Sequence, residues 1–241
     1  MKIAFISDIH GNAIALEAVL KDIENKHVDK IVVLGDLAYR GPEPKRSIEL
    51  VKGLNTTVIK GNADEWIVRG VNQGEVPDKV LDLMNEERDW SVSQIDQADM
   101  DYLAQLPTEI TLEDEGIKFH AFHATPTSLF DVVLPDAADS ELESKLISAK
   151  DADVYLYGHI HKAYIRYVQG KTIINLGSIG LPFDGVTKAS YAIVNVKDGI
   201  LSTSIERVSY DYQKTIDLYD TVNYPNTSMM KNIVKSASIN N

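Results

Sequence analysis

The chain has 241 residues, 44% hydrophobic and 25% charged, which suits a globular α/β protein and excludes low-complexity and collagen-like chains. Its formal net charge of −12 argues against non-specific nucleic-acid binding and against anionic membrane surfaces, because both require a basic surface. The absence of cysteine excludes disulfides, thiolate metal sites and cysteine nucleophiles. No stretch approaches the roughly 20 apolar residues of a membrane helix and the first residues do not form a signal peptide, so we expect a cytoplasmic protein.

The first part of the chain alternates between strand and helix patterns. Short apolar runs that end in polar residues predict buried strands at Ile3–Ile6, Ile31–Leu34 and Thr57–Ile59. Apolar residues at helical spacing predict helices over Ala13–Ile23 and Lys45–Leu54 between them. This alternation favours a parallel sheet with helical crossovers.

A polar helical insertion over about 64–106 comes next, and the later part is rich in hairpins. Strand pairs are predicted around Glu115–Gly116, Gln169–Gly170 and Asp198–Gly199, with a further strand at Asp153–Tyr157. Residues 139–149 have a helical pattern. A helix from about Asp211 and an irregular tail rich in Asn and Ser form the C-terminal segment, about 209–241. No repeat or linker divides the chain, so we expect one domain over 1–241.

Polar side chains follow the predicted strands at the points where they end. In open α/β sheets, ligands bind outside the carboxyl ends of the strands. The residues at these ends are Asp8, His10, Asp36, Asn62, His123, His159 and His161. Imidazole and carboxylate groups are ligands for borderline-hard divalent cations, and seven of them suit two metals that share a carboxylate better than one zinc. Each residue alone could equally be a helix cap or a structural histidine, but the whole set favours a metal site.

The segments SDIHGN, LGDLAYRGP, KGNAD, HATP, YGHIHK and NLGSIGLPFDG occur in this order over most of the chain. Together they resemble the calcineurin-like metallophosphoesterase superfamily, and most closely its compact bacterial phosphodiesterase-like and diadenosine-tetraphosphate-hydrolase-like members. The resemblance implies an α/β fold, a four-layer α-β-β-α sandwich with a helical insertion.

The resemblance also implies roles for the strand-end residues. Asp8, His10 and His161 would bind one metal, Asn62, His123 and His159 the other, and Asp36 would bridge both. The implied cofactors are two divalent metal ions, most naturally Mn or Fe, with Zn, Ni or Co as alternatives. The implied mechanism is attack of a metal-bridging hydroxide on phosphorus, with Asp36 and Asn62 as catalytic residues.

One position departs from the family pattern. Many members have a histidine after the Gly-Asn pair that protonates the leaving group, but this chain has Ala63 there. The loss of a general acid is expected to slow alkyl esters most, which favours activated phosphodiesters and nucleotide polyphosphate linkages as substrates. His120 is a candidate replacement, although it is expected on the strand face opposite to His123.

Three further residues each have two possible roles. Arg40, four residues after Asp36, either binds substrate phosphate, as the arginine of the protein-phosphatase branch does, or is a solvated loop residue. Asp64 either orients a site group or caps the following helix. Trp66 is expected to pack the insertion rather than to stack on a base.

The sequence therefore predicts a metal-dependent phosphoric ester hydrolase, of phosphodiesterase or asymmetric dinucleoside-tetraphosphate hydrolase type, that acts on a small phosphoester or nucleotide. A phosphomonoesterase or protein phosphatase is the alternative within the class. A metal-binding scaffold, or a nucleotide sensor without turnover, is the alternative outside it. The sequence does not determine the oligomeric state.

Overall fold

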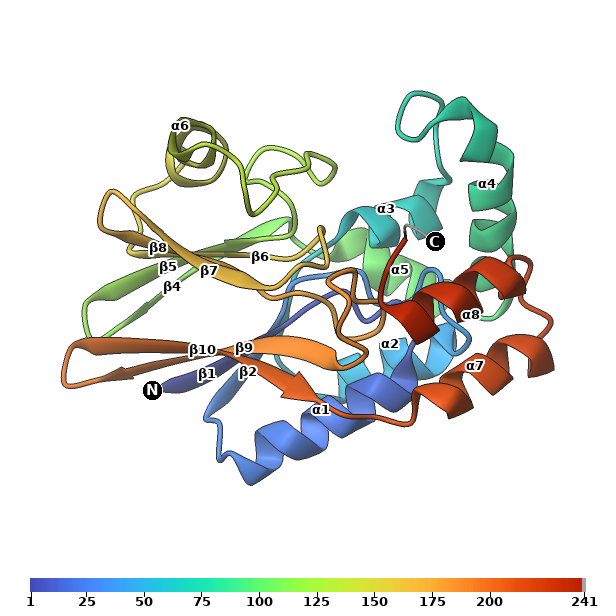
Figure 1. Ribbon diagram of the computed structural model, residues 1–241, viewed down its shortest axis with the longest axis horizontal. Helices are drawn as coiled ribbons and strands as arrows, with labels where there is room; N and C mark the ends of the chain where they lie inside the picture. Colours follow the sequence, from blue (N-terminus) through green and yellow to red (C-terminus); the bar gives the residue numbers. More distant parts are fainter. Residues whose placement is uncertain (240–241) are drawn as a thin grey trace.

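The computed structural model describes residues 1–239, so the last two residues of the expected C-terminal segment lie outside the described part. Two five-stranded sheets are stacked face to face, with helices on their outer sides (Figure 1). This arrangement confirms the predicted α/β fold class. Within residues 1–239 no helix is both long enough and apolar enough to cross a bilayer.

The first sheet has the strand order β10-β9-β1-β2-β3. Its strands are β1 (Lys2–Ile6), β2 (Lys30–Val33), β3 (Thr57–Val58), β9 (Ala189–Lys197) and β10 (Ile200–Val208). Strands β1, β2 and β3 are parallel, as the alternation of strand and helix predicts, and β9 and β10 add an antiparallel hairpin at one side.

The second sheet has the strand order β4-β5-β6-β8-β7. Its strands are β4 (Glu109–Asp114), β5 (Ile117–Phe122), β6 (Val154–Tyr157), β7 (Tyr164–Val168) and β8 (Lys171–Asn175). The hairpins β4–β5 and β7–β8 have the predicted turns, and β6 lies parallel to both β5 and β8.

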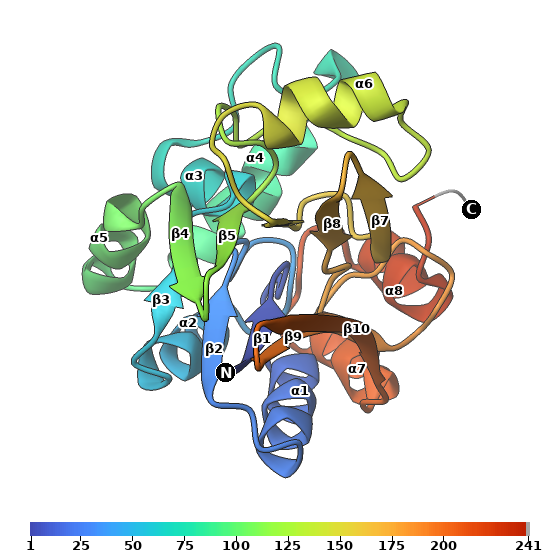
Figure 2. The same cartoon turned by 90° about the vertical axis from the view of Figure 1, so that its left-hand side faces the viewer.

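The helices cover the outer faces and the carboxyl ends of the strands. They are α1 (Ala13–Asn25), α2 (Pro44–Gly53), α3 (Asn62–Arg69), α4 (Asp78–Ser93), α5 (Gln97–Gln105), α6 (Asp139–Leu142), the π-helix η1 (Glu143–Ile147), α7 (Tyr212–Thr221) and α8 (Thr227–Ser236). Figure 2 shows α1 and α7 below the first sheet and α6 above the second.

Strand alternation divides the core into layers. Ile3 and Phe5 of β1 point between the two sheets, whereas Ala4 and Ile6 point toward the helices outside the first sheet. In β6, Leu156 likewise points between the sheets. Every residue of β1 after Lys2 is buried, as expected of a strand that is covered on both faces.

Two expectations about secondary structure need correction. The C-terminal segment is not irregular, because α8 follows α7 and buries Met230, Ile233 and Val234 against it. Those residues recur at helical spacing, and their packing outweighs the weak helix propensity of the surrounding Asn, Ser and Thr. The single helix expected over 139–149 is a short α-helix that continues as a π-helix.

Candidate metal centre

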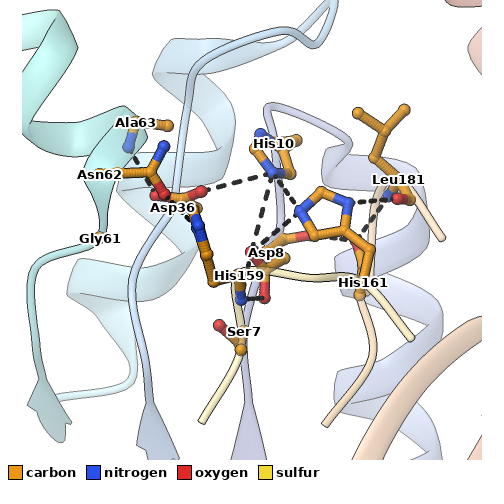
Figure 3. Close-up of polar contacts among 12 residues, drawn as sticks. Ser7, Asp8, His10, Asp36, Gly61, Asn62, Ala63, His159, His161 and Leu181 are labelled. Carbon is orange, nitrogen blue, oxygen red and sulfur yellow. Dashed lines mark hydrogen bonds and ion pairs between the residues drawn. The ribbon is translucent and has the colours of Figure 1, made fainter. Parts of the chain in front are cut away.

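The strand-end residues converge at the carboxyl ends of the central strands. Asp8 and His10 follow β1, Asp36 follows β2, and Asn62 is the first residue of α3 after β3. The remaining three come from the second sheet, where His123 follows β5, and His159 and His161 follow β6. We call these seven residues the cleft floor. Figure 3 shows Asp8, His10, Asp36 and His161 turned toward one another.

Much of the floor has a left-handed backbone. Asp8, His10, Asp36, His159 and His161 have φ between 48° and 67°, a region that costs a non-glycine residue about 1 kcal/mol or more. Backbone hydrogen bonds hold the first two loops together, because Asp8 N donates to Gly35 O at 3.1 Å and His10 N donates to Asp36 O at 2.9 Å. Such clustered strain is typical of a functional site.

Asp8, His10 and His161 form the first part of the floor. Nε2 of His161 lies 3.1 Å from Asp8 Oδ1 and 3.1 Å from Nε2 of His10. The ligand atoms of these three residues and of Asp36 all lie within 4.8 Å of one another, and all four residues are buried. Two imidazole nitrogens that face each other beside carboxylates are the donor set of a divalent cation site.

Backbone carbonyls orient these imidazoles. Nδ1 of His10 lies 2.8 Å from Tyr39 O, and Nδ1 of His161 lies 2.5 Å from Leu181 O. A proton on each Nδ1 completes these hydrogen bonds and leaves the Nε2 lone pair free to face the site. His10 and His161 are therefore held in the tautomer that binds a metal through Nε2.

Asn62, His123 and His159 form the second part. Asn62 Oδ1 lies 2.9 Å from His123 Nε2 and 2.8 Å from His159 Nδ1. His123 Nδ1 lies 2.7 Å from Leu34 O, which again directs Nε2 into the site.

Asp36 lies between the two parts. Its Oδ2 is 3.5 Å from His10 Nε2 and 3.4 Å from His123 Nε2, while its Oδ1 accepts a hydrogen bond from Ala63 N at 2.8 Å. Gly61 allows this approach, because a Cβ at that position would lie 2.0 Å from Asp36 Oδ1.

The protonation of the floor reflects its burial and its mixed charges. Burial lowers the pKa of both His10 and His159 to about 4, and a neighbouring histidine adds to the shift in each case. His123 is different, because burial disfavours its charge but Asp36 outweighs burial and raises the pKa to about 10. Asp36 and His123 therefore favour each other's charged forms at the centre of the floor.

Asp64 has both roles considered for it. Its carboxylate accepts backbone N–H groups from Asp36 at 2.8 Å, from Leu37 at 2.9 Å and from Gly61 at 2.8 Å. It therefore caps α3 and also ties the loop after β2 to the start of that helix. Burial raises the pKa of this carboxyl to about 7, and the nearby charge of Asp36 contributes.

Residues at the end of β8 and in the segment after it contact the backbone of the loops that carry the floor residues. Ser178 Oγ donates to Asp8 O at 2.7 Å, and Asn175 Nδ2 donates to Gly158 O at 2.6 Å. Gly180 passes so close to Ile9 that a Cβ would lie 1.8 Å from the carbonyl oxygen of Ile9. These residues fix the backbone of two loops of the floor.

A cleft opens over the floor and has a largely apolar wall. The floor residues that line it are His10, Asp36, Asn62, His159 and His161. The residues around them, which we call the cleft wall, are Tyr39, Arg40, Ala63, Trp66, Met84, Leu181 and Phe183. Phe183 stacks on His161, with ring centroids 4.3 Å apart.

Trp66 packs as predicted, with its ring against Tyr39 and Phe130 and only 9% of its surface exposed. Trp66 also lines the cleft, so the insertion supplies part of the wall.

Arg40 is not a solvated loop residue. It lines the cleft, and its Nε lies 3.2 Å from Oε2 of the fully buried Glu87 on α4. The sequence contains no signal for this partner, because Glu87 lies in a polar helix among several other acidic residues.

His120 lies away from the cleft. Its Nε2 is 2.6 Å from Glu109 Oε2, and its ring contacts Phe122 and Tyr155 on the outer face of the second sheet. It is therefore on the face opposite to His123, as its position in the strand predicts, and it is not placed to replace the missing general acid.

The fold and the buried Asp and His cluster fit a metal-dependent phosphoesterase, and comparison with known proteins gives the family. The family model for the calcineurin-like phosphoesterase superfamily domain matches residues 1–199, so the chain belongs to this superfamily. Members of this family are metal-dependent phosphoester hydrolases, which fits the buried Asp and His cluster.

Several individual proteins are similar to this chain. An uncharacterized protein of Methanocaldococcus jannaschii is 32% identical over 89% of this chain and 90% of its own length. A symmetrical bis(5'-nucleosyl)-tetraphosphatase of Erwinia tasmaniensis is 26% identical over 61% of this chain, and the match spans 52% of that enzyme. A crystal structure of a metallophosphoesterase from Sphaerobacter thermophilus has a TM-score of 0.78 and 26% identity, and the match covers 98% of this chain and 99% of that one.

Proposed function

We propose that this protein hydrolyses phosphoesters with two divalent cations bound at the cleft floor. The observation that supports this most directly is the position of Asp36, whose Oδ2 lies 3.5 Å from His10 Nε2 and 3.4 Å from His123 Nε2. One carboxylate thus faces two separate sets of ligands. Asp8, His10 and His161 would hold one cation, and Asn62, His123 and His159 the other, with Asp36 between them.

The donor atoms fit a first-row divalent metal. Neutral imidazole and carboxylate ligands suit Mn and Fe, and Zn, Ni and Co are accepted by the same donor types. When bound, the metal pair supplies a hydroxide at neutral pH and a positive field for the transferred phosphoryl group. Everything else that the substrate meets comes from the chain itself.

Two side chains have donors available for phosphate oxygens. Among residues 1–239 no acceptor pairs with the Nδ2 of Asn62 or with either terminal nitrogen of Arg40, although both residues line the cleft. A guanidinium can donate two parallel hydrogen bonds to one phosphate group, and an amide can donate a third. We assign substrate binding to Arg40 and stabilisation of the phosphoryl oxygens to Asn62.

The nature of the leaving group follows from Ala63. Ala63 lines the cleft beside Asn62, and the imidazoles that line the same cleft are those of His10, His159 and His161 in the floor. With no separate imidazole to protonate a leaving alkoxide, the site favours leaving groups that are already stable anions, such as aryl oxides and nucleotide phosphates.

The substrate class is therefore an activated phosphodiester or a nucleotide polyphosphate. The likeness to the symmetrical tetraphosphatase of Erwinia tasmaniensis supports the polyphosphate linkage without deciding which phosphate is attacked.

Hydrolysis by the metal-stripped protein, with and without Mn²⁺, tests the proposal. The substrates are an aryl phosphodiester, an aryl phosphomonoester and a dinucleoside tetraphosphate. We expect Mn²⁺-dependent turnover that favours the diester or the tetraphosphate over the monoester. Absence of turnover on all three, by folded protein that still binds two metals, would contradict the proposal and favour a nucleotide sensor or a scaffold.

A further inference from the structure

The buried carboxylate behind Arg40 has no part in the proposed chemistry. Glu87 lies on α4 with its side chain fully buried, and its Oε2 is 3.2 Å from Arg40 Nε. Its other oxygen, Oε1, accepts a hydrogen bond from Asn226 Nδ2 at 3.0 Å. A carboxylate that is buried this deeply must be compensated by a positive charge or by hydrogen bonds, and Arg40 and Asn226 supply one of each.

The geometry leaves the terminal nitrogens of Arg40 available for a ligand. Glu87 takes the Nε side of the guanidinium, and within the described residues nothing pairs with the two terminal nitrogens. The side chain is 19% exposed and lines the cleft beside Asp36 and Asn62. Glu87 therefore contacts the guanidinium at Nε, and Arg40 lines the same cleft as the floor residues Asp36 and Asn62.

The backbone of Arg40 is held by a second element. Its φ is 70°, and its carbonyl oxygen accepts a hydrogen bond from the hydroxyl of Tyr219 on α7 at 2.8 Å. Tyr219 on α7 thus contacts the backbone of Arg40, and Asn226, the N-cap residue of α8, contacts the carboxylate of Glu87. Tyr219 and Tyr224 pack together in the same apolar cluster as Leu181 of the cleft wall.

The negative charge of Glu87 also affects the position of the Arg40 side chain. A guanidinium beside two bound divalent cations is repelled toward solvent, and a long side chain has many conformations in which it would point away. Burial lowers the pKa of the Arg40 guanidinium, but Glu87 together with Tyr39, Tyr224 and Tyr219 raises it, so the net shift is upward. The contact of Glu87 with Nε restricts the conformations that the Arg40 side chain can adopt.

We infer that Glu87 is a positioning residue for phosphate binding, held in turn by Asn226, and that it acts only through Arg40. This inference rests on the proposed function, since it gives Arg40 a phosphate ligand. It assigns to α4 and α8, which contribute no residue to the floor, control over how tightly the substrate phosphate binds.

Binding of inorganic phosphate to the Mn²⁺-loaded full chain tests the inference by calorimetry, independently of turnover. The E87Q variant keeps the size of the side chain and removes its charge, and we expect it to weaken phosphate binding about 10-fold. The E86Q variant is the matched control, because Glu86 is the exposed neighbour on the same helix, and its affinity is expected to stay within about twofold of the parent.

A double-mutant cycle separates positioning from general damage to the fold. In the R40A background, E87Q is expected to cause no further loss of phosphate affinity, because the group that it positions is gone. An equal loss with and without Arg40, or no loss from E87Q alone, would overturn the inference.

A second variant covers the case in which E87Q does not fold. N226A removes the hydrogen bond to Glu87 from a partly exposed position and is expected to weaken phosphate binding in the same direction, again only when Arg40 is present. An unchanged affinity in N226A would then overturn the inference. Failure of the proposed function is distinguishable, because it would appear as a parent protein that binds phosphate but does not hydrolyse esters.

Discussion

The cleft floor and the cleft wall are built in different ways. The floor consists of side chains that directly follow strands, and backbone carbonyls of Tyr39, Leu181 and Leu34 orient three of its imidazoles. The wall comes from helices and loops far apart in the chain, including Trp66 on α3, Met84 on α4 and Phe183 after β8. The sheets therefore position the proposed metal ligands, while the surrounding helices and loops line the cleft above them.

The largest effect is expected in the floor, at Asp36. Replacement by asparagine removes the charge that faces both ligand sets, so D36N is expected to lower kcat on the order of 10³-fold and to reduce the number of bound metals. Metal content and steady-state kinetics measure this. D101N, at an exposed position on α5, is the control, and similar losses in both variants would show that the effect is not specific to the floor.

The next effect is expected where the wall meets the floor, at Arg40. R40A is expected to lower kcat/KM about 100-fold, because two hydrogen bonds to the substrate phosphate are lost. Its metal content is expected to equal that of the parent protein, because Arg40 is not a proposed metal ligand. R40K keeps the charge but lacks the planar guanidinium, and its kcat/KM is expected to lie between those of R40A and the parent protein. If R40A lost metal instead, the division between floor and wall would be wrong at this residue.

A gain of activity is expected in the wall at Ala63. A63H restores an imidazole beside Asn62, and we expect it to raise turnover of an alkyl phosphodiester by about 10-fold or more, with little change for an aryl diester. A63Q has a side chain of similar size without an acidic proton and should not reproduce the gain. Equal rates of the parent protein on alkyl and aryl esters, with chemistry rate-limiting, would remove the reason for the preference.

The smallest effect is expected outside both regions, at His120. Burial lowers the pKa of His120 below its ordinary value of 6.5 despite the opposing charge of Glu109. The folded state then binds fewer protons than the unfolded state, so this histidine contributes stability above pH 6.5 that is lost as the pH falls through its folded pKa. The free energy of unfolding of H120Q is expected to depend less on pH between about 7 and 5, the range in which a histidine titrates, and hydrolysis should be unaffected. A large loss of hydrolysis in H120Q would give His120 a role that its position on the outer face does not suggest.

The same contrast explains what the sequence could predict. Asp8, Asp36 and Asn62 each end an apolar run, so strand position alone places them at one edge of the sheet, and the structure brings them together there. The hairpin turns predict the strands of the second sheet, and the family resemblance implies the fold with two sheets. These features depend on local pattern and on the fixed geometry of sheets.

The wall depends instead on contacts between distant segments. Glu87 gains its importance only because α4 buries it against Arg40, and Asn226, the N-cap residue of α8, only because it reaches Glu87 on α4. The helix α8 itself was not predicted, although Met230, Ile233 and Val234 have helical spacing, because Asn, Ser and Thr around them disfavour a helix in isolation. Tertiary packing, rather than local pattern alone, decides such features.

We propose that the cleft floor holds two metal ions with Asp36 between them. Anomalous difference density from crystals of the protein loaded with Mn²⁺ tests it most directly. We predict two peaks about 3.5–4 Å apart, one beside Asp8, His10 and His161, the other beside Asn62, His123 and His159, and both in contact with Asp36. A single peak, or two peaks that do not share Asp36, would contradict this arrangement of the metals.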